Sequence, residues 1–193
     1  GGNVMATIRC ADYRPQMATV RPGVMKLAEA QPGKQGEVED FKVEFTPEDM
    51  NVTIKEVIKE TKKAVDITDA KVLVSGGRGI GSADYYKELQ KVADLLGGEI
   101  SSSRANVDAG WIAKDRQVGQ TGKTVRPDLY LACGISGAIQ HIAGMENSEC
   151  VISINKNDTA AIFDVSDLGI VGDVKVIIPK LIDALTKYKA AQN

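Results

Sequence analysis

Two stretches of glycine and small polar residues, residues 117–122 (QVGQTG) and residues 134–137 (GISG), lie on either side of a short apolar run. The run, Leu129–Cys133, has the length and composition of a buried strand, and residues 138–145 have helical composition. Glycine lets a backbone approach a ligand closely, and free N–H groups at the start of a helix favour anions. This order of strand, Gly-Ser turn and helix predicts a seat for a phosphate group.

A further glycine-rich turn, residues 75–81 (SGGRGIG), follows an apolar run and precedes a predicted helix. This is the placement of a dinucleotide-binding turn, but Ser82 stands where the G-x-G-x-x-G pattern needs its last glycine. No acidic residue follows the next predicted strand to hold a ribose; Arg104 stands there instead, as in proteins that bind NADP. From the motif alone, the turn fits either nucleotide binding or a purely structural role.

The sequence GISGA at residues 134–138 resembles the nucleophile elbow of hydrolases, but Ala138 replaces its last glycine. The chain has one histidine, His141, five residues after Ser136 in the same predicted helix, and this spacing points it away from the serine. Hydrolase chemistry is therefore disfavoured. We expect Ser136 to cap the helix and to contact a phosphate.

The composition excludes several classes of protein. The net charge is −2 and aromatic residues make up 5% of the chain, so neither an electrostatic attraction to nucleic acid nor a stacking platform for bases is expected. No apolar run is long enough to predict membrane insertion. Cys10, Cys133 and Cys150 are isolated, which disfavours zinc sites and disulfide frameworks and favours a reducing compartment. No metal site is predicted.

Strands and helices are expected to alternate from residue 71 onward. The predicted strands are residues 71–75, 99–102, 129–133, 150–155 and 161–165, and the predicted helices are residues 82–96, 138–145 and 173–188. This alternation predicts an α/β fold with a doubly wound parallel sheet. Such sheets bind ligands at the carboxyl ends of their strands, where all the candidate turns are expected to lie.

Together these motifs resemble the FAD-binding domain of the electron transfer flavoprotein alpha subunits, from about Lys71 to about Leu185. The matching stretches are SGGRG (75–79), SSRANVDAG (102–110), QVGQTG (117–122), GISGAIQH (134–141), INK (154–156) and GIVGD (169–173). The resemblance implies a Rossmann-like domain that binds FAD. The cofactor-binding residues that it implies are Arg78, Ser103, Arg104, Gln117, Val118, Gly119, Gln120, Thr121, Gly134, Ser136, Gly137, Ala138, Ile139, Gln140, His141, Asn155, Asp173 and Val174.

The resemblance also implies a role for several of these residues. Arg104 lies against the flavin ring, and Thr121 lies near its N5 atom. His141 supplies a cation or an N–H donor near N1 and O2, which stabilises the negative charge of a reduced ring. Arg78 lies near the ribose and the pyrophosphate. The contacts to the adenosine half come from Asn155, Asp173 and Val174.

By this resemblance, the chain is an electron carrier rather than a stand-alone enzyme. It pairs with an electron transfer flavoprotein beta subunit as a heterodimer. It moves electrons between flavoprotein dehydrogenases, such as the acyl-CoA dehydrogenases of fatty acid beta-oxidation, and an acceptor oxidoreductase. The expected compartment is the bacterial cytoplasm or the mitochondrial matrix, and membership of an electron-bifurcating complex stays open. The alternative from the residues is an NADP-dependent oxidoreductase that uses the glycine turn and Arg104.

Residues 1–58 are expected to be the C-terminal remnant of a first α/β domain, followed by a linker at residues 59–70 and the FAD-binding domain at residues 71–193. Alternating apolar residues predict strands at residues 4–9, 17–24, 38–45 and 52–58. The chain starts with Gly1 and shows no leader pattern, so we expect it to be a fragment of a longer protein.

Overall fold

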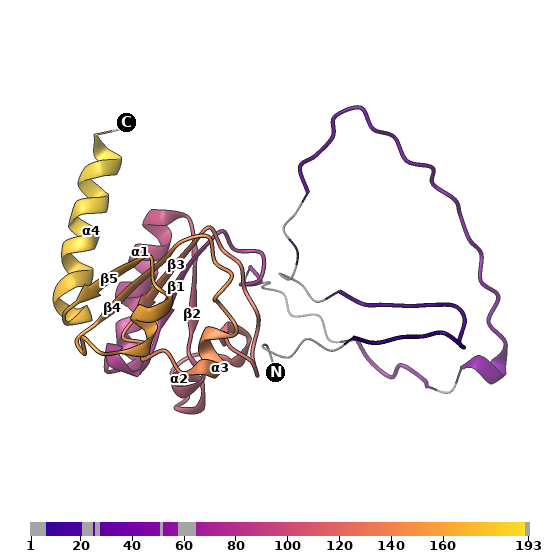
Figure 1. Cartoon of the computed structure of the whole chain (residues 1–193), viewed down its shortest axis with the longest axis horizontal. Helices are drawn as coiled ribbons and strands as arrows, with labels where there is room; N and C mark the ends of the chain where they lie inside the picture. Colours follow the sequence, from indigo (N-terminus) through magenta and orange to yellow (C-terminus); the bar gives the residue numbers. More distant parts are fainter. Residues whose placement is uncertain (1–6, 21–24, 26–27, 51, 58–64, 192–193) are drawn as a thin grey trace. The chain divides into compact units, whose positions relative to one another are not determined.

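The computed structural model describes residues 7–20, 25, 28–50, 52–57 and 65–191. Contacts group the chain into two compact units, Gly1–Met25 with Val65–Asn193, and Lys26–Ala64. Regular structure is concentrated in residues 65–191, whose elements are labelled in Figure 1.

A five-stranded, fully parallel sheet forms the centre of residues 65–191. Its strands are β1 (Val72–Gly76), β2 (Glu99–Ser102), β3 (Leu129–Cys133), β4 (Val151–Asn155) and β5 (Leu168–Val171). Their order in space is β2-β1-β3-β4-β5. The chain therefore reverses its direction across the sheet between β1 and β3, and that switch point is where α/β sheets of this order bind ligands. The predicted α/β fold with a parallel sheet is confirmed.

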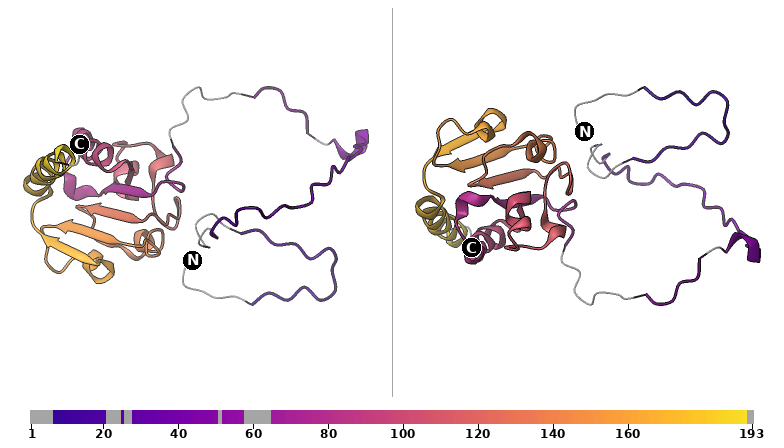
Figure 2. Two further views of the ribbon diagram at one scale, coloured as in Figure 1. Left: turned by 90° about the horizontal axis from the view of Figure 1, so that it is seen from above. Right: turned by 90° about the horizontal axis from the view of Figure 1, so that it is seen from below.

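One face of the sheet is covered by the two long helices, α1 (Tyr86–Leu96) and α4 (Val174–Ala190). They lie side by side, as Figure 2 shows from above and below. Leu89 of α1 and Ile178 of α4 are fully buried in this half of the core. As expected, α1 ends at Gly97, whose left-handed backbone (φ +67°) suits glycine.

The other face is covered by shorter pieces. They are α3 (Ile139–Ile142), the 3₁₀ helix η5 (Ala161–Val165) and the loop that leads from residue 117 to β3. Leu73 and Tyr130 of the sheet are fully buried in this half of the core together with Met145 and with Ile162 of η5. The remaining short elements are η1 (Pro47–Asp49), η2 (Arg78–Ile80), η3 (Ala83–Tyr85), α2 (Arg104–Asp108) and η4 (Lys114–Arg116).

Two sequence predictions on this face are wrong, and one strand of the sheet was not predicted. The helix predicted at residues 138–145 has only the four residues of α3, and the strand predicted at residues 161–165 is η5. The fifth strand, β5, was not predicted, because its side chains are mostly exposed and Gly169 interrupts its apolar pattern. The short run in η5 is apolar because Ile162 fills the core from outside the sheet.

The strands predicted before residue 58 are not formed in the described residues. Residues 7–20, 28–50 and 52–57 form no strand pairs among the described residues, and their only regular element is η1. Phe41 and Phe45, in the strand predicted at residues 38–45, are 85% and 70% exposed. A strand needs hydrogen bonds from a neighbouring strand, and these residues find none within the described chain. Residues 4–6, 21–24 and 58 of these predictions lie outside the described residues.

Candidate functional site

A cavity of about 610 Å³ lies at the carboxyl edge of the sheet, where β1, β2 and β3 end. Five pieces of chain form its wall: the turn after β1, the start of α2 after β2, residues 117–121, the turn that leads from β3 into α3, and Asn155 at the end of β4. This is the switch point of the sheet. The candidate turns of the sequence therefore meet at one place.

Most of the predicted site residues lie in the wall of this cavity. They are Arg78, Ser103, Arg104, Gln117, Val118, Gly119, Gln120, Thr121, Gly134, Ser136, Ala138, Gln140, His141 and Asn155. Asp173 and Val174 line a smaller pocket of about 40 Å³ that shares Asn155 with the main cavity. Gly137 and Ile139 line neither space. Gly137 packs against the backbone of η5, and the side chain of Ile139 is 73% exposed.

The two glycine turns contact each other through their backbones. The N–H of Gly77 donates to the carbonyl of Cys133 at 2.9 Å, and the N–H of Gly79 donates to the carbonyl of Gly134 at 3.0 Å. A Cβ atom on Gly79 would lie 2.7 Å from the Cα of Gly134. These glycines therefore allow the turns after β1 and β3 to approach each other closely.

The loop at residues 117–122 is held in place by contacts within it, to α3 and just beyond its end. Inside the loop, the Gln117 amide donates to the Thr121 hydroxyl at 3.0 Å. On the side of α3, the N–H of Gln120 donates to the carbonyl of Gln140 at 2.7 Å. Beyond the loop, Lys123 contacts Asp66 at 2.8 Å. The loop is therefore an anchored part of the cavity wall.

The turn before α3 presents backbone donors but no side-chain cap. The N-cap of α3 is Ala138, without a side-chain cap hydrogen bond, so the prediction that Ser136 caps the helix is wrong. Ser136 and Ala138 line the cavity, and no hydrogen bond from either backbone N–H group is found among the described residues. Free N–H groups at a turn attract an anionic group.

His141 is a neutral imidazole at the base of the wall. Only 6% of its surface is exposed. Burial lowers the pKa of His141 to about 4, because a charged ring would lose its hydration. The Val118 backbone beside the ring offsets this shift only in part. Nε2 lies 3.0 Å from the hydroxyl of Tyr130, while Nδ1 has no partner at hydrogen-bonding geometry. Without a ligand the ring is therefore uncharged at neutral pH, and both roles of His141 beside a flavin stay predictions.

Arg104 begins α2 and shares the cavity wall with Asp108 one turn later. The guanidinium Nε lies 3.2 Å from Asp108 Oδ2, and both side chains are mostly exposed. Between them, Asn106 is fully buried and fixes α2 to the end of β1, donating to the Gly76 carbonyl at 3.2 Å and the Tyr86 hydroxyl at 2.9 Å. Sequence reasoning missed Asp108, although its spacing of four residues from Arg104 is a signal for an ion pair on a helix.

The residues expected at the adenosine half also have structural roles. Asn155 donates to the carbonyl of Ile135 at 2.8 Å, and its side-chain oxygen accepts from the N–H of Asn157 at 2.9 Å. Asp173 caps α4 by accepting from the N–H of Lys175 at 2.8 Å. The other lining residues that were not predicted are Gly77, Gly79, Ala105 and Ile135 in the cavity, and Lys156 and Gly172 in the smaller pocket.

The wall suits an elongated organic anion better than covalent catalysis. Arg78 and Arg104 provide positive charge, Asp108 provides one negative charge, and the turn provides backbone donors. The hydroxyl of Ser136 is exposed and has no hydrogen-bond partner among the described side chains, while His141 Nε2 contacts Tyr130 instead. Burial raises the pKa of the Cys133 thiol to about 12, so it is not a nucleophile.

Comparison with known proteins gives one consistent family. The electron transfer flavoprotein FAD-binding domain matches residues 66–146, and the electron transfer flavoprotein domain matches residues 1–46. The electron transfer flavoprotein subunit alpha of Thermoanaerobacterium thermosaccharolyticum is 54% identical over 98% of this chain and 57% of its own length. The acryloyl-CoA reductase electron transfer subunit beta of Anaerotignum propionicum is 49% identical over 99% and 53%, respectively.

A eukaryotic relative is the mitochondrial electron transfer flavoprotein subunit alpha of Dictyostelium discoideum, 43% identical over 97% of this chain and 54% of its own length. The chain thus spans a little over half the length of these relatives. Among the residues that the structure describes, none of the helices has both the length and the apolar composition needed to cross a membrane.

Proposed function

Since the chain belongs to the electron transfer flavoprotein alpha-subunit family, we propose that it binds FAD in the cavity at the carboxyl edge of its sheet and carries electrons between flavoprotein partners. The matched FAD-binding domain, residues 66–146, includes the turns after β1 and β3 and residues 117–121 between them. The observation that carries the proposal is the wall itself. It combines backbone N–H groups without partners at Ser136 and Ala138 with the cation of Arg78.

The residues present fit the parts of FAD. The turn at Ser136 and the cation of Arg78 suit the pyrophosphate, because both attract negative charge. Thr121, Arg104 and His141 line the same cavity and are the proposed contacts to the ring. The smaller pocket suits the adenosine half. Its predicted contacts are Asn155, Asp173 and Val174.

When bound, FAD supplies a ring that takes up and releases electrons. The chain's part is to hold the ring, to shield it from water and to set its potential. The charge of Arg104 favours the added electron density, and Asp108 beside it weakens that effect. A neutral His141 can donate one hydrogen bond to an oxygen or nitrogen of the ring, which strengthens as that atom becomes more negative.

The structure disfavours the NADP alternative. Binding of a 2′-phosphate requires an arginine that is free to pair with it. Arg104 already contacts Asp108, and that carboxylate would repel the phosphate. Asp108 is therefore expected to select against NADP, while an uncharged flavin ring tolerates the pair.

The partners and the compartment belong to the same proposal. We propose a heterodimer with an electron transfer flavoprotein beta subunit, electron donors such as acyl-CoA dehydrogenases, and an acceptor oxidoreductase. The bacterial cytoplasm or the mitochondrial matrix is the proposed compartment. We also propose domain limits of 1–58, 59–70 and 71–193, although the burial of Ile67 in the core extends the compact part slightly before Lys71. The exposed apolar residues before residue 58 support completion of their sheet by further chain.

The proposal is tested by what the purified chain retains. A yellow protein that releases FAD on denaturation supports it. A colourless protein whose melting temperature is raised by NADPH, but not by FAD, would favour the alternative. Addition of FAD should also raise the melting temperature, since a ligand that binds only the native state stabilises it.

A further inference from the structure

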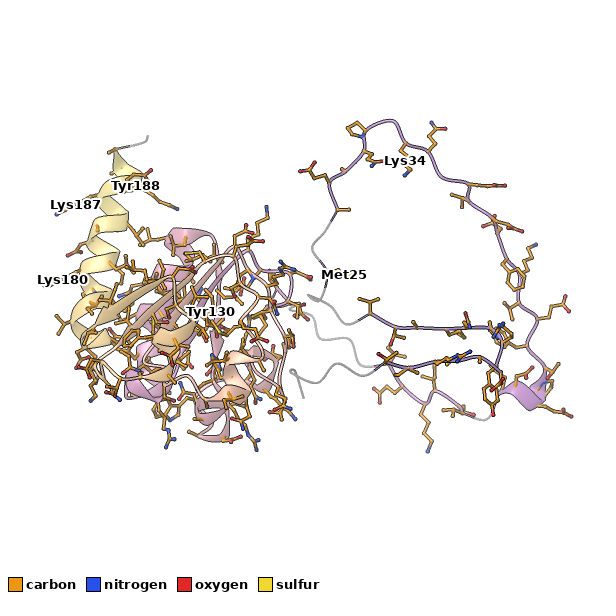
Figure 3. All side chains as sticks on the ribbon, in the orientation of Figure 1. Met25, Lys34, Tyr130, Lys180, Lys187 and Tyr188 are labelled. Atoms are coloured by element: carbon orange, nitrogen blue, oxygen red, sulfur yellow. The ribbon has the colours of Figure 1, made fainter. Side chains whose placement is uncertain are left out.

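The short helix α2 has one buried side chain, and that side chain is polar. Side chains fill the interior of residues 65–191, Tyr130 among them (Figure 3), and most of the buried ones are apolar. The buried residue of α2 is instead Asn106. A helix of five residues is too short to be stable by itself. The position of α2 therefore depends on what holds it to the sheet.

Asn106 holds α2 to the end of β1 by hydrogen bonds. Its amide nitrogen lies 3.2 Å from the Gly76 carbonyl oxygen and 2.9 Å from the Tyr86 hydroxyl. A carbonyl oxygen only accepts, so the group that faces Gly76 is the NH2 group, and this fixes the orientation of the amide. Two directional bonds from one planar group fix both the place of the helix and its rotation about its own axis.

The same bonds decide where Arg104 and Asp108 lie. These residues are two positions before and two positions after Asn106, and each residue of an α-helix turns by about 100°. Both therefore lie on the side of α2 that is opposite Asn106, and both line the cavity. Their ion pair joins two residues of the same helix, so it cannot fix that helix to the sheet.

Stability alone does not explain an asparagine at position 106. Its Oδ1 atom is buried and has no hydrogen-bond partner among the described residues, a cost that offsets much of what the two bonds contribute. Without this side chain, the Gly76 carbonyl would still accept from the N–H of Ser103 at 3.1 Å. The Tyr86 hydroxyl would still contact Ser102 at 2.6 Å. The bonds of the asparagine therefore matter more for the position of α2 than for the stability of the fold.

We propose that Asn106 is a positioning residue that holds the Arg104–Asp108 pair at the cavity, so that both charges act on the ligand bound there. The inference deepens the proposed function and rests on it for the identity of that ligand. Asn106 itself lines neither space, so its replacement acts through α2. When α2 is no longer fixed, each charge should lose part of its effect on a bound flavin.

The two charges of the pair have opposite signs, and this makes the proposal testable. Asn106→Ala is made in the full chain with bound FAD, once with Asp108→Asn and once with Arg104→Ala. If half of the effect of each charge is lost, the equilibrium constant for one-electron reduction of FAD should fall about twofold in the first background. It should rise by up to about twofold in the second, where the anion alone is left. A general structural effect would have the same sign in both.

Ser153→Ala is the matched control. Ser153 lies on β4, is fully buried and lines neither space; its hydroxyl accepts from Ser166 at 2.6 Å. Its replacement also removes a buried polar side chain from the sheet region, but it does not involve α2. The equilibrium constant for reduction should equal that of the parent.

A second measurement needs no FAD. Trypsin cuts after arginine, and the bond after Arg104 becomes accessible more often when α2 opens. In the FAD-free chain this cut should be about fivefold faster for Asn106→Ala than for the parent or Ser153→Ala, the factor expected for one hydrogen bond. If Asn106→Ala does not fold, Tyr86→Phe carries the same test. It removes one acceptor of Asn106 and keeps the ring, and the cut should again be faster than in the parent.

Two results would overturn the proposal. One is a change in reduction of the same sign, or no change, in the two charge backgrounds. The other is cleavage after Arg104 at the rate of the parent. Faster cleavage in a chain that does not bind FAD would contradict the proposed function and leave the attachment of α2 by Asn106 standing.

Discussion

The guanidinium Nε of Arg104 lies 3.2 Å from the carboxylate Oδ2 of Asp108, and both side chains line the same cavity. The pair therefore brings a positive and a negative charge to the place where we expect the flavin ring. Both side chains are mostly exposed, so solvent screens each of them. Their effects on a bound flavin should be opposite in sign and modest in size.

Arg104→Ala is expected to lower the reduction potential of bound FAD, because the cation favours the electron density added on reduction. Screening by solvent reduces the effect to about 1 kcal/mol, which corresponds to roughly 40 mV for a one-electron couple. Arg104→Lys should restore part of the shift, since it keeps the charge but loses the planar fork. A potentiometric titration measures both, and a potential equal to that of the parent would rule out Arg104 as a ring contact.

Asp108→Asn is expected to raise the same potential by roughly 10–40 mV, because it removes the anion that offsets Arg104. It should also weaken the discrimination against NADPH. Asp84→Asn is the control, since Asp84 forms an exposed pair of the same kind with Lys87 and lines neither space. If the two variants change the potential equally, the local argument for Asp108 is wrong.

His141 is expected to make the stability of the FAD-free chain dependent on pH. Its pKa is about 4 in the folded chain and near 6.5 in an unfolded chain, so the unfolded state binds the proton first. The stabilisation is complete above pH 6.5 and is lost as the pH falls from 6.5 to 4, by up to about 3 kcal/mol. Urea unfolding of the parent and of His141→Gln should show this loss in the parent alone. Equal pH profiles for the parent and for His141→Gln would contradict the conclusion that His141 is buried and neutral in the folded chain.

Gly79→Ala tests the contact between the two glycine turns. Its Cβ would lie 2.7 Å from the Cα of Gly134, so the turns must separate. A destabilisation of about 1–3 kcal/mol is expected, together with weaker FAD binding. Gly36→Ala is the control, because a Cβ there meets no atom within 4 Å and the backbone is not left-handed. A Gly79→Ala chain as stable as this control would show that the turns tolerate separation.

The sequence alone predicted those elements whose composition and spacing are typical of their structure. The apolar runs of β1 and β3, the helical spacing of α1 and the glycine turns all identified their elements. Sequence prediction failed for segments whose structure depends on their packing or pairing with other parts of the chain. The run in η5 has the composition of a strand, and only its place against the core shows otherwise. The strands predicted before residue 58 have the right alternation but no neighbour to pair with among the described residues.

The candidate site was likewise predicted from the sequence only in part. The resemblance placed His141 and Arg104 near the ligand from short motifs. It could not show the partner of either one. Tyr130 reaches His141 of α3 from strand β3, and Asp108 acts through the geometry of a five-residue helix. The neutral state of His141 also depends on its burial, which no spacing in the sequence reveals.

The most direct test of the central claim is an equilibrium titration of the FAD-free chain with FAD, FMN and NADPH. The account predicts binding of FAD, and binding of FMN that is weaker by about tenfold or more. Loss of the contacts in the smaller pocket should cost at least about 1.4 kcal/mol. Binding of NADPH is expected to be weaker still. Equal affinity for FMN and FAD would remove the adenosine site, and tighter binding of NADPH than of FAD would contradict the account as a whole.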